Sequence, residues 1–364
     1  MSIAPAPAPA LATPEELAGR LFESAVGAME IVSVYAGEKL GWYASLANDG
    51  AATATELATR TGTHERYVRE WLEQQATAGF LTFTREPGGT ARFAMPSGYE
   101  AVLTERESEL FVAPLGRFLV SVVAKAPQAL ECFRSGGGVP WEAFGEDMRT
   151  AQADFNRPFF MNSLVRGYLS QIPGIDGALT QPGSRVAEIG PGGGWAAIAI
   201  ASAYPDARVD GFDLDEASVL LARENVAEAG LSDRITVHHC DAADAGINGQ
   251  CDLVCALECI HDLPDPVGVL ATMRRLAKPG APVVVMDERV NDEFGAVGDL
   301  TERLFYAFSL GVCLLDGMSH ANSAGTGAVM RASTLRSYAK EAGFTDIEVL
   351  PLEHDLFRFY RLLP

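Results

Sequence analysis

Two alternating patterns of hydrophobic positions run through the C-terminal half of the chain. Short segments that are apolar at nearly every position predict strands buried on both faces, and the longer segments between them have the length of helices. The strands are expected in RVAEIG (185–190), RVDGFDLD (208–215), ITVHHCDAAD (235–244), CDLVCALECI (251–260) and APVVVMDERV (281–290). This alternation predicts a parallel sheet covered by helices on both faces, the doubly wound α/β class.

The end of the chain changes pattern. TLRSYAKEAGFTDIEVLPLEHDLFRFYRLL (334–363) predicts one helix followed by two strands, the second with alternating polarity. We therefore expect a Rossmann-like domain over residues 181–364, with seven mostly parallel strands, a C-terminal antiparallel hairpin and an insertion at about 295–330.

The N-terminal region has helical spacing instead. Residues 15–47 carry apolar side chains at intervals of three and four. Thr55 is expected to cap a short helix after them, Gly62 to form a turn, and Thr63 to cap a second helix.

The second of these short helices is amphipathic and is followed by a hairpin. It places Val68, Leu72 and Gln75 on one face with Trp71 beside them, and a two-stranded ribbon is expected around the turn at 87–89. Two helices and a two-stranded ribbon form a winged-helix pattern, which we assign to residues 15–100.

A winged helix suggests DNA binding, but the charge argues against it. Residues 56–92 hold five arginines and five glutamates, whereas a helix that reads a DNA groove is basic. The net charge of the chain is −20, which also disfavours nucleic acid and anionic membranes. We expect no nucleic-acid or membrane partner, and a structural or dimerising role for this domain.

The remaining segments complete the expected order. Residues 1–14 alternate alanine and proline and predict a disordered tail, and residues 101–180 predict a helical linker. The linker is broken by SGGGVPWEAFG (135–145), whose glycines and aromatic side chains suit a lid or a pocket wall. With no secretion signal, no membrane-spanning run and six cysteines that lack zinc-finger spacing, we expect a cytoplasmic protein with reduced thiols.

Glycines crowd the turn between the first strand and the first helix of the predicted sheet. Gly190, Gly192 and Gly194 lie in VAEIGPGGGW, where bare backbone and a helix N-terminus can meet a ligand. The spacing does not fit the G-x-G-x-x-G pattern of dinucleotide binding, which leaves a nicotinamide oxidoreductase as a minor alternative. Glu188 precedes the glycines, and an acid there suits the ammonium of an amino-acid ligand such as S-adenosylmethionine.

Acids at the ends of the next two strands agree with that ligand. Asp213 is placed to accept both ribose hydroxyls, and Asp241 is placed to accept the adenine amino group. The predicted cofactor set also includes Leu214, Ala242 and Glu258.

The motifs EIGPGGG, GFDLD and CDAAD resemble those of class I S-adenosylmethionine-dependent methyltransferases. With the winged helix, the chain is similar to plant-type and actinobacterial small-molecule O-methyltransferases. The resemblance implies S-adenosylmethionine as cofactor, S-adenosylhomocysteine as product, a small-molecule acceptor and a homodimer formed through the N-terminal domain. FNRPFFMNS resembles the family's substrate-lining segment and implies Phe155, Met161 and Asn162 as acceptor contacts; Trp141 of the glycine-rich segment joins them.

Histidine chemistry points to the catalytic group. His261, in ECIHDLPDP, follows the fourth strand and can take a proton from a phenol or hydroxyl. The motif is similar to the His-Asp pair of plant-type O-methyltransferases, whose histidine is the base. In those relatives an acid after the next strand orients the histidine, and here Asp287 or Glu288 takes that part.

Two further functions stay open from the sequence. Some relatives methylate the carbon beside a keto group with a metal, and here His261, Asp262 and His320 could hold one. We expect no metal in the first hypothesis, and His320 is then an acceptor contact. A regulator that senses S-adenosylmethionine through an inactive catalytic domain is the other alternative.

Overall fold

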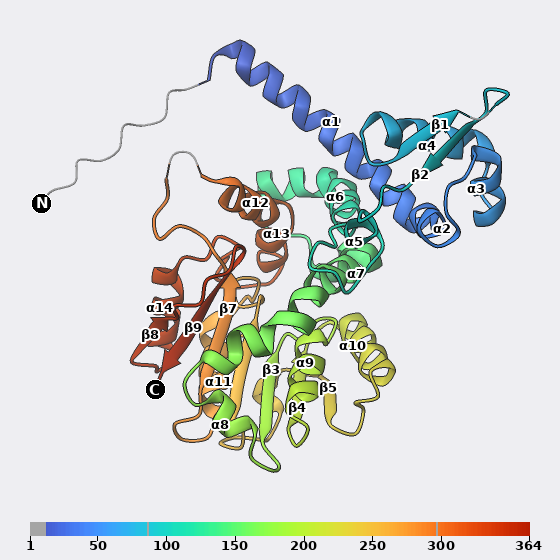
Figure 1. The fold of residues 1–364 in the computed structure, drawn as a ribbon. Helices are drawn as coiled ribbons and strands as arrows, with labels where there is room; N and C mark the ends of the chain where they lie inside the picture. Colours follow the sequence, from blue (N-terminus) through green and yellow to red (C-terminus); the bar gives the residue numbers. More distant parts are fainter. Residues whose placement is uncertain (1–11, 86, 296–297) are drawn as a thin grey trace, which may run out of the picture. The chain divides into compact units, whose positions relative to one another are not determined.

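The structure is a computed structural model that describes residues 12–85, 87–295 and 298–364. The predicted tail falls almost wholly on residues 1–11, outside the described part. The chain divides into two compact units, Met1–Val123 and Ala124–Pro364, and the division falls inside one helix, α6 (Leu115–Ser135) (Figure 1). The domain bounds predicted at residues 100 and 180 stay a prediction.

The first unit contains the expected winged helix. Helices and a two-stranded antiparallel ribbon follow one another in the predicted order. They are α1 (Pro14–Lys39), α2 (Trp42–Asp49), α3 (Ala54–Thr61), α4 (Glu65–Thr77), β1 (Thr82–Arg85), β2 (Ala91–Ala94) and the short α5 (Glu100–Leu103).

The two predicted helix caps were wrong by one or two residues. Thr53, not Thr55, caps α3, because Thr53 and Glu56 exchange side-chain and backbone hydrogen bonds in a capping box. His64, not Thr63, caps α4, and its ring nitrogen accepts the N–H of Arg66 at 3.2 Å.

The amphipathic face of α4 packs as predicted. Val68, Trp71, Leu72 and Gln75 are all buried in the core of the first unit. Gln75 is the polar member, and its side-chain oxygen accepts a hydrogen bond from the hydroxyl of Tyr43. A buried amide at this position is therefore satisfied.

The segment before the sheet is helical, as expected. It comprises the C-terminal part of α6, then α7 (Trp141–Phe159), the π-helix η1 (Phe160–Tyr168), the 3-10 turn η2 (Leu169–Gln171) and α8 (Ile175–Leu179). The backbone at Gly145 departs from helical geometry inside α7, with φ 83°. The first turn of α7 is thus set off from the rest of the helix.

A seven-stranded sheet dominates the described part of the second unit, in the order β5-β4-β3-β6-β7-β9-β8. The first five strands in this order are parallel and the last two pairings are antiparallel, which confirms the predicted sheet. Its strands are β3 (Arg185–Ile189), β4 (Arg208–Asp213), β5 (Ile235–His239), β6 (Leu253–Leu257), β7 (Val283–Glu288), β8 (Asp346–Val349) and β9 (Phe357–Leu363). Figure 1 shows helices on both sides of it.

Alternate residues of each strand pack into two different cores. Val186 and Val209 face the core that α9 (Trp195–Ala203) and α10 (Glu216–Glu228) cover, whereas Ala187 faces the core under α11 (Pro266–Leu276) and α14 (Ala332–Glu341). The insertion after β7 contains α12 (Leu300–Phe308), the π-helix η4 (Ser309–Cys313) and α13 (Leu314–Gly317). In the described ranges, no helix combines the length and the apolar content that crossing a membrane requires.

Candidate functional site

The order of the sheet reverses between β3 and β6. Chain order runs outward from β3 to β4 and β5 on one side and from β6 to β7 on the other. The carboxyl ends of parallel strands at such a switch point form the usual ligand crevice of an open α/β sheet. The residues singled out from the sequence follow these strand ends.

The glycine turn after β3 has a backbone that other residues rarely adopt. Gly190, Gly192 and Gly194 have φ of 65°, 52° and 77°. The turn is closed by the N–H of Gly194, which donates to the carbonyl of Pro191 at 2.7 Å, and α9 starts directly after it. The loop therefore ends at the free N–H groups of a helix N-terminus.

Glu188 is buried beneath this turn, with 2% of its surface exposed. Burial and then the charge of Asp213 raise its pKa to about 8, although the N–H of Ala197 in the first turn of α9 partly opposes the shift. Its Oε2 has no hydrogen-bond partner. Glu188 is thus a buried acid with one oxygen available to a cation.

Asp213 ends β4 beside the same turn. Its two oxygens accept the N–H groups of Gly192 at 3.3 Å and Asp215 at 2.9 Å. Burial outweighs these bonds and raises the pKa of Asp213. The backbone contact to Gly192 fixes the carboxylate against the glycine turn.

The predicted adenine residues follow β5. Asp241 is exposed and accepts the N–H of Ala243 at 2.8 Å, so it caps the short turn η3 (Ala242–Asp244). Ala242 is buried, whereas Leu214 after β4 is exposed over 63% of its surface. These residues flank the open end of the strands.

Glu258, directly after β6, connects the strand ends to α7. Its backbone is in the left-handed region at φ 62°, and its N–H donates to the carbonyl of Met286 at 2.7 Å. Its carboxylate accepts the side-chain amides of Gln152 at 3.1 Å and Asn156 at 2.5 Å. Burial raises the pKa of Glu258 to about 7, against the opposing effect of His261.

The same side of α7 touches the glycine turn. Arg149 forms a 2.9 Å ion pair with Asp215, and Arg157 stacks 4.1 Å from the ring centre of Trp195. A Cβ on Gly193 would lie 2.6 Å from the Cβ of Ala153, so α7 lies directly against this loop. Sequence reasoning missed Arg149, Gln152 and Asn156, although their spacing of three and four along a helix was a usable signal.

His261 is the buried imidazole at the end of β6, with 2% exposure. Its Nδ1 lies 2.7 Å from Asp287 Oδ1 in a hydrogen bond. Glu288 Oε2 is also 2.8 Å from Nδ1, but it lacks the geometry of a hydrogen bond. The two candidate acids therefore both reach the ring, and Asp287 is the one that accepts from it.

The pKa values of His261, Asp287 and Glu288 depend on their burial and on one another's charges. Burial opposes the charged form of His261, yet the carboxylates of Asp262, Glu288 and Asp287 outweigh it and raise its pKa well above the ordinary value. Burial also opposes ionisation of Asp287, but His261 keeps the pKa of that acid lowered. For Glu288 burial dominates and raises the pKa well above its ordinary value, although His261 opposes this shift.

The other ring nitrogen faces the insertion. His261 Nε2 lies 3.3 Å from Asp262 Oδ1, and Cys313 joins them with all three ligand atoms within 4.8 Å of one another. His261, Asp287 and Glu288 form a second such group. His320 belongs to neither group found in the described residues and is exposed.

The residues predicted to contact the acceptor differ in their burial and in the elements that carry them. The N–H of Trp141 donates to Asp316 at 2.8 Å, so the start of α7 is held against α13. Phe155 and Met161 are half-buried, whereas Asn162 is exposed on η1. Trp141 is thus attached to the insertion that also carries Cys313.

Buried polar atoms without hydrogen-bond partners gather at this edge. Such atoms in a folded chain are uncommon and point to a ligand or water. Within the described ranges they include Asn156 Oδ1, Glu188 Oε2, Trp195 Nε1, Asp262 Oδ1 and Asp287 Oδ2. The carboxyl edge of the sheet is therefore a polar site prepared for a bound molecule.

Comparisons with known proteins agree with this geometry. Residues 186–280 match a methyltransferase domain, and residues 27–105 match an Rv2258c-like winged helix-turn-helix domain. A ubiquinone biosynthesis O-methyltransferase of Aromatoleum aromaticum is 28% identical over 176 residues, which are 48% of this chain and 69% of that protein. The enzyme of the same name from Hahella chejuensis is 36% identical over 110 residues, or 29% of this chain and 44% of that protein.

Solved structures match over nearly the whole chain. PigF with S-adenosylhomocysteine is 20% identical with a TM-score of 0.71, covering 97% of this chain and 100% of that chain. Human N-acetylserotonin methyltransferase in complex with S-adenosylmethionine is 17% identical with a TM-score of 0.67, covering 97% and 99%. At these identities the likeness establishes the fold.

The two domain matches and the sheet together define the class of protein. The chain is an S-adenosylmethionine-dependent methyltransferase, with a winged-helix domain ahead of a Rossmann-like catalytic domain. S-adenosylmethionine is its cofactor.

Proposed function

We propose that the chain methylates a hydroxyl oxygen of a small molecule and that His261 accepts the hydroxyl proton. The observation that carries the proposal is the hydrogen bond of 2.7 Å between His261 Nδ1 and Asp287 at the end of the strand beside the cofactor crevice. A carboxylate on Nδ1 keeps the hydrogen on that nitrogen and leaves Nε2 as the acceptor. The names of the relatives, which are O-methyltransferases, support the same reaction class.

The residues of the crevice fit the cofactor. Glu188, with its unpartnered Oε2, would pair with the ammonium, and the glycine turn would lie along the methionine part. Asp213 would accept the ribose hydroxyls, and Asp241 with Ala242 would meet the adenine. Leu214 and Glu258 complete the proposed set.

When bound, S-adenosylmethionine supplies a methyl group on a positively charged sulfonium. The chain's own contribution is to orient the acceptor and to remove its proton. Asp287 holds the imidazole in place, and a cation beside His261 favours the neutral ring that can take a proton. The proposed acceptor contacts are Trp141, Phe155, Met161, Asn162 and His320.

The test is transfer of a labelled methyl group from S-adenosylmethionine to a panel of phenols, alcohols and keto acids. We expect a phenol or alcohol to be labelled and His261→Asn to lower kcat about 10²- to 10⁴-fold. The affinity for S-adenosylhomocysteine should change less than about twofold, because His261 is proposed to act on the acceptor and not on the cofactor. His64→Asn is the matched control, since asparagine also caps helices. Full activity of His261→Asn would refute the role of this residue.

A second candidate is metal-dependent methylation of carbon beside a keto group. The grouping of His261, Asp262 and Cys313 favours it, with Cys313 in the place that the sequence assigned to His320. In this case a chelator would abolish labelling of keto acids, and added metal would restore it. Labelling of phenols that survives chelation supports the first candidate instead.

We also propose a homodimer formed through the N-terminal unit. The outer side of α1 exposes apolar residues, which a second copy can cover; they are Leu17, Leu21, Phe22, Val26 and Met29. A role as a DNA-binding regulator that senses S-adenosylmethionine is less well supported. Arg66 and Arg69 of α4 form ion pairs with Glu70 and Glu65 of the same helix. The free thiols of all six cysteines fit the expected cytoplasmic location.

A further inference from the structure

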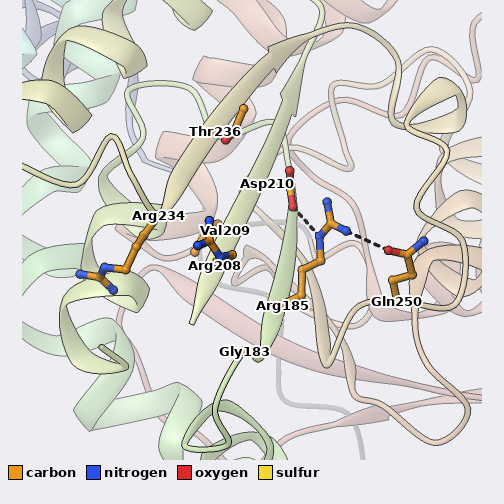
Figure 2. Close-up of a pocket in the computed structure, with 8 residues that line it drawn as sticks. All are labelled: Gly183, Arg185, Arg208, Val209, Asp210, Arg234, Thr236 and Gln250. Atoms are coloured by element: carbon orange, nitrogen blue, oxygen red, sulfur yellow. Dashed lines mark hydrogen bonds and ion pairs between the residues drawn. The ribbon is translucent and has the colours of Figure 1, made fainter. Parts of the chain in front are cut away.

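The opposite, amino edge of the sheet contains a cavity of about 500 Å³. It lies at the starts of β3, β4 and β5, so the whole length of these strands separates it from the cofactor residues at their other ends. Its volume is within the range of small-molecule sites, about 300–1,000 Å³. Three arginines dominate its lining (Figure 2).

The three arginines occupy adjacent backbone positions at the starts of three neighbouring strands. Arg185 and Arg208 are direct partners in the register of β3 and β4. Arg234 precedes the pair Val209–Ile235, so it stands next to Arg208 on the other side. Like charges on neighbouring strands destabilise a sheet unless something balances them.

One of these charges is balanced within the protein. Arg185 forms a 2.7 Å ion pair with Asp210 and donates to the side-chain oxygen of Gln250 at 2.9 Å, as Figure 2 shows. The second bond turns the amide nitrogen of Gln250 away from Arg185, where it can donate to a ligand. Arg185 and Gln250 therefore form one polar wall of the cavity.

The other two charges have no carboxylate partner among the described residues. Arg208 is exposed and donates to the backbone carbonyl of Asp233 at 3.2 Å. Arg234 donates to the carbonyls of Ala201 and Tyr204 in the last turn of α9. Carbonyl oxygens satisfy some of the N–H groups, but they carry no full negative charge that would balance the two guanidinium groups.

We propose that this cavity binds a phosphorylated small molecule, separately from the methyltransferase site. A phosphate supplies the missing negative charge and matches the planar donors of arginine in a two-point contact. The hydroxyl of Thr236 and the amide of Gln250 add neutral donors at the same cavity. Phosphate binding at this cavity requires neither the cofactor nor the acceptor, so it can be tested independently of the proposed reaction.

The test is calorimetric titration of the full chain with pyrophosphate, inorganic phosphate and AMP at constant ionic strength. Saturating S-adenosylhomocysteine is present throughout, so that AMP cannot enter the proposed adenine site. We expect saturable binding at one site, and the order of the three probes tells a nucleotide or ester ligand from free phosphate. Arg208→Gln should weaken binding at least tenfold, because it removes one of the two unbalanced charges while leaving an exposed position. Arg166→Gln is the control, as it removes an exposed arginine on η1 outside the cavity.

Two results would overturn the proposal. One is binding that Arg208→Gln and Arg166→Gln weaken equally, which indicates general charge attraction. The other is no saturable heat for any probe at millimolar concentration in protein with a normal melting curve. In that case the arginines serve only the ion pair with Asp210 and the end of α9.

Discussion

The proposed contact of Glu188 with the cofactor ammonium, together with the burial of this acid, predicts that cofactor binding depends on pH. In the free enzyme its pKa is about 8, against an ordinary 4.5, so the carboxyl is protonated at pH 6 and pH 7. In the proposed contact the ammonium of the cofactor pairs with the ionised carboxylate, so we expect binding to release a proton. Below the free-enzyme pKa, each unit of pH should then change the affinity about tenfold, or about 1.4 kcal/mol.

The assay is calorimetric titration with S-adenosylhomocysteine at pH 6 and pH 7, in two buffers of different ionisation enthalpy. The dissociation constant should fall about tenfold from pH 6 to pH 7, with close to one proton released per molecule bound. Asp213 and Glu258 are also acids of raised pKa in this region and can contribute to the slope. Glu188→Gln isolates the share of Glu188.

In Glu188→Gln the affinity should be weaker at pH 7 and most of the pH dependence should be gone, because glutamine has no proton to release. The reasoning fails if the variant keeps the slope of the wild type. It also fails if the wild type binds equally well at both pH values.

Three other substitutions test the structure. Gly194→Ala should lower the free energy of unfolding by about 1–3 kcal/mol in denaturant titrations, because the φ of Gly194 is 77° and a Cβ there would lie 3.2 Å from the Cβ of Ala222. The control is Gly177→Ala in α8, where a Cβ meets open space and the free energy of unfolding should not fall. Leu72→Ala, fully buried in the first unit, should cost about 2–5 kcal/mol, and a loss below 1 kcal/mol would contradict its place in the core. Phe22→Glu on the exposed side of α1 should convert the proposed dimer to a monomer in sedimentation, whereas an unchanged mass would exclude this face from the interface.

The strands, and the positions of the acids at their carboxyl ends, could be predicted because their signals are local. Apolar runs of five or six residues mark buried strands, and a strand that ends in an acid puts that acid at the carboxyl edge. Glu188 and Asp213 follow this rule, and the contact between Asp213 and Gly192 joins two segments that the sequence already paired. The capping box of Thr53 and Glu56 was also present in the sequence, so that error was avoidable.

The rest depends on packing that no local pattern contains. Asn156 and Glu258 are 102 residues apart and meet because α7 crosses the strand ends. Strand alternation sends neighbouring side chains to opposite faces, which forced a choice between Asp287 and Glu288. In the structure both acids reach His261 from the last two residues of β7, so alternation alone could not decide between them. Cys313 reaches the same imidazole through the insertion, whose path the sequence does not specify.

A crystal structure of the enzyme with S-adenosylhomocysteine would test the central claim most directly, that the strand-end acids, the glycine turn and His261 form one methyl-transfer site. The account predicts the amino group at Glu188, the ribose at Asp213 and the sulfur on the side of the crevice where His261 lies. A nucleoside bound elsewhere, or one whose sulfur faces away from His261, would contradict it.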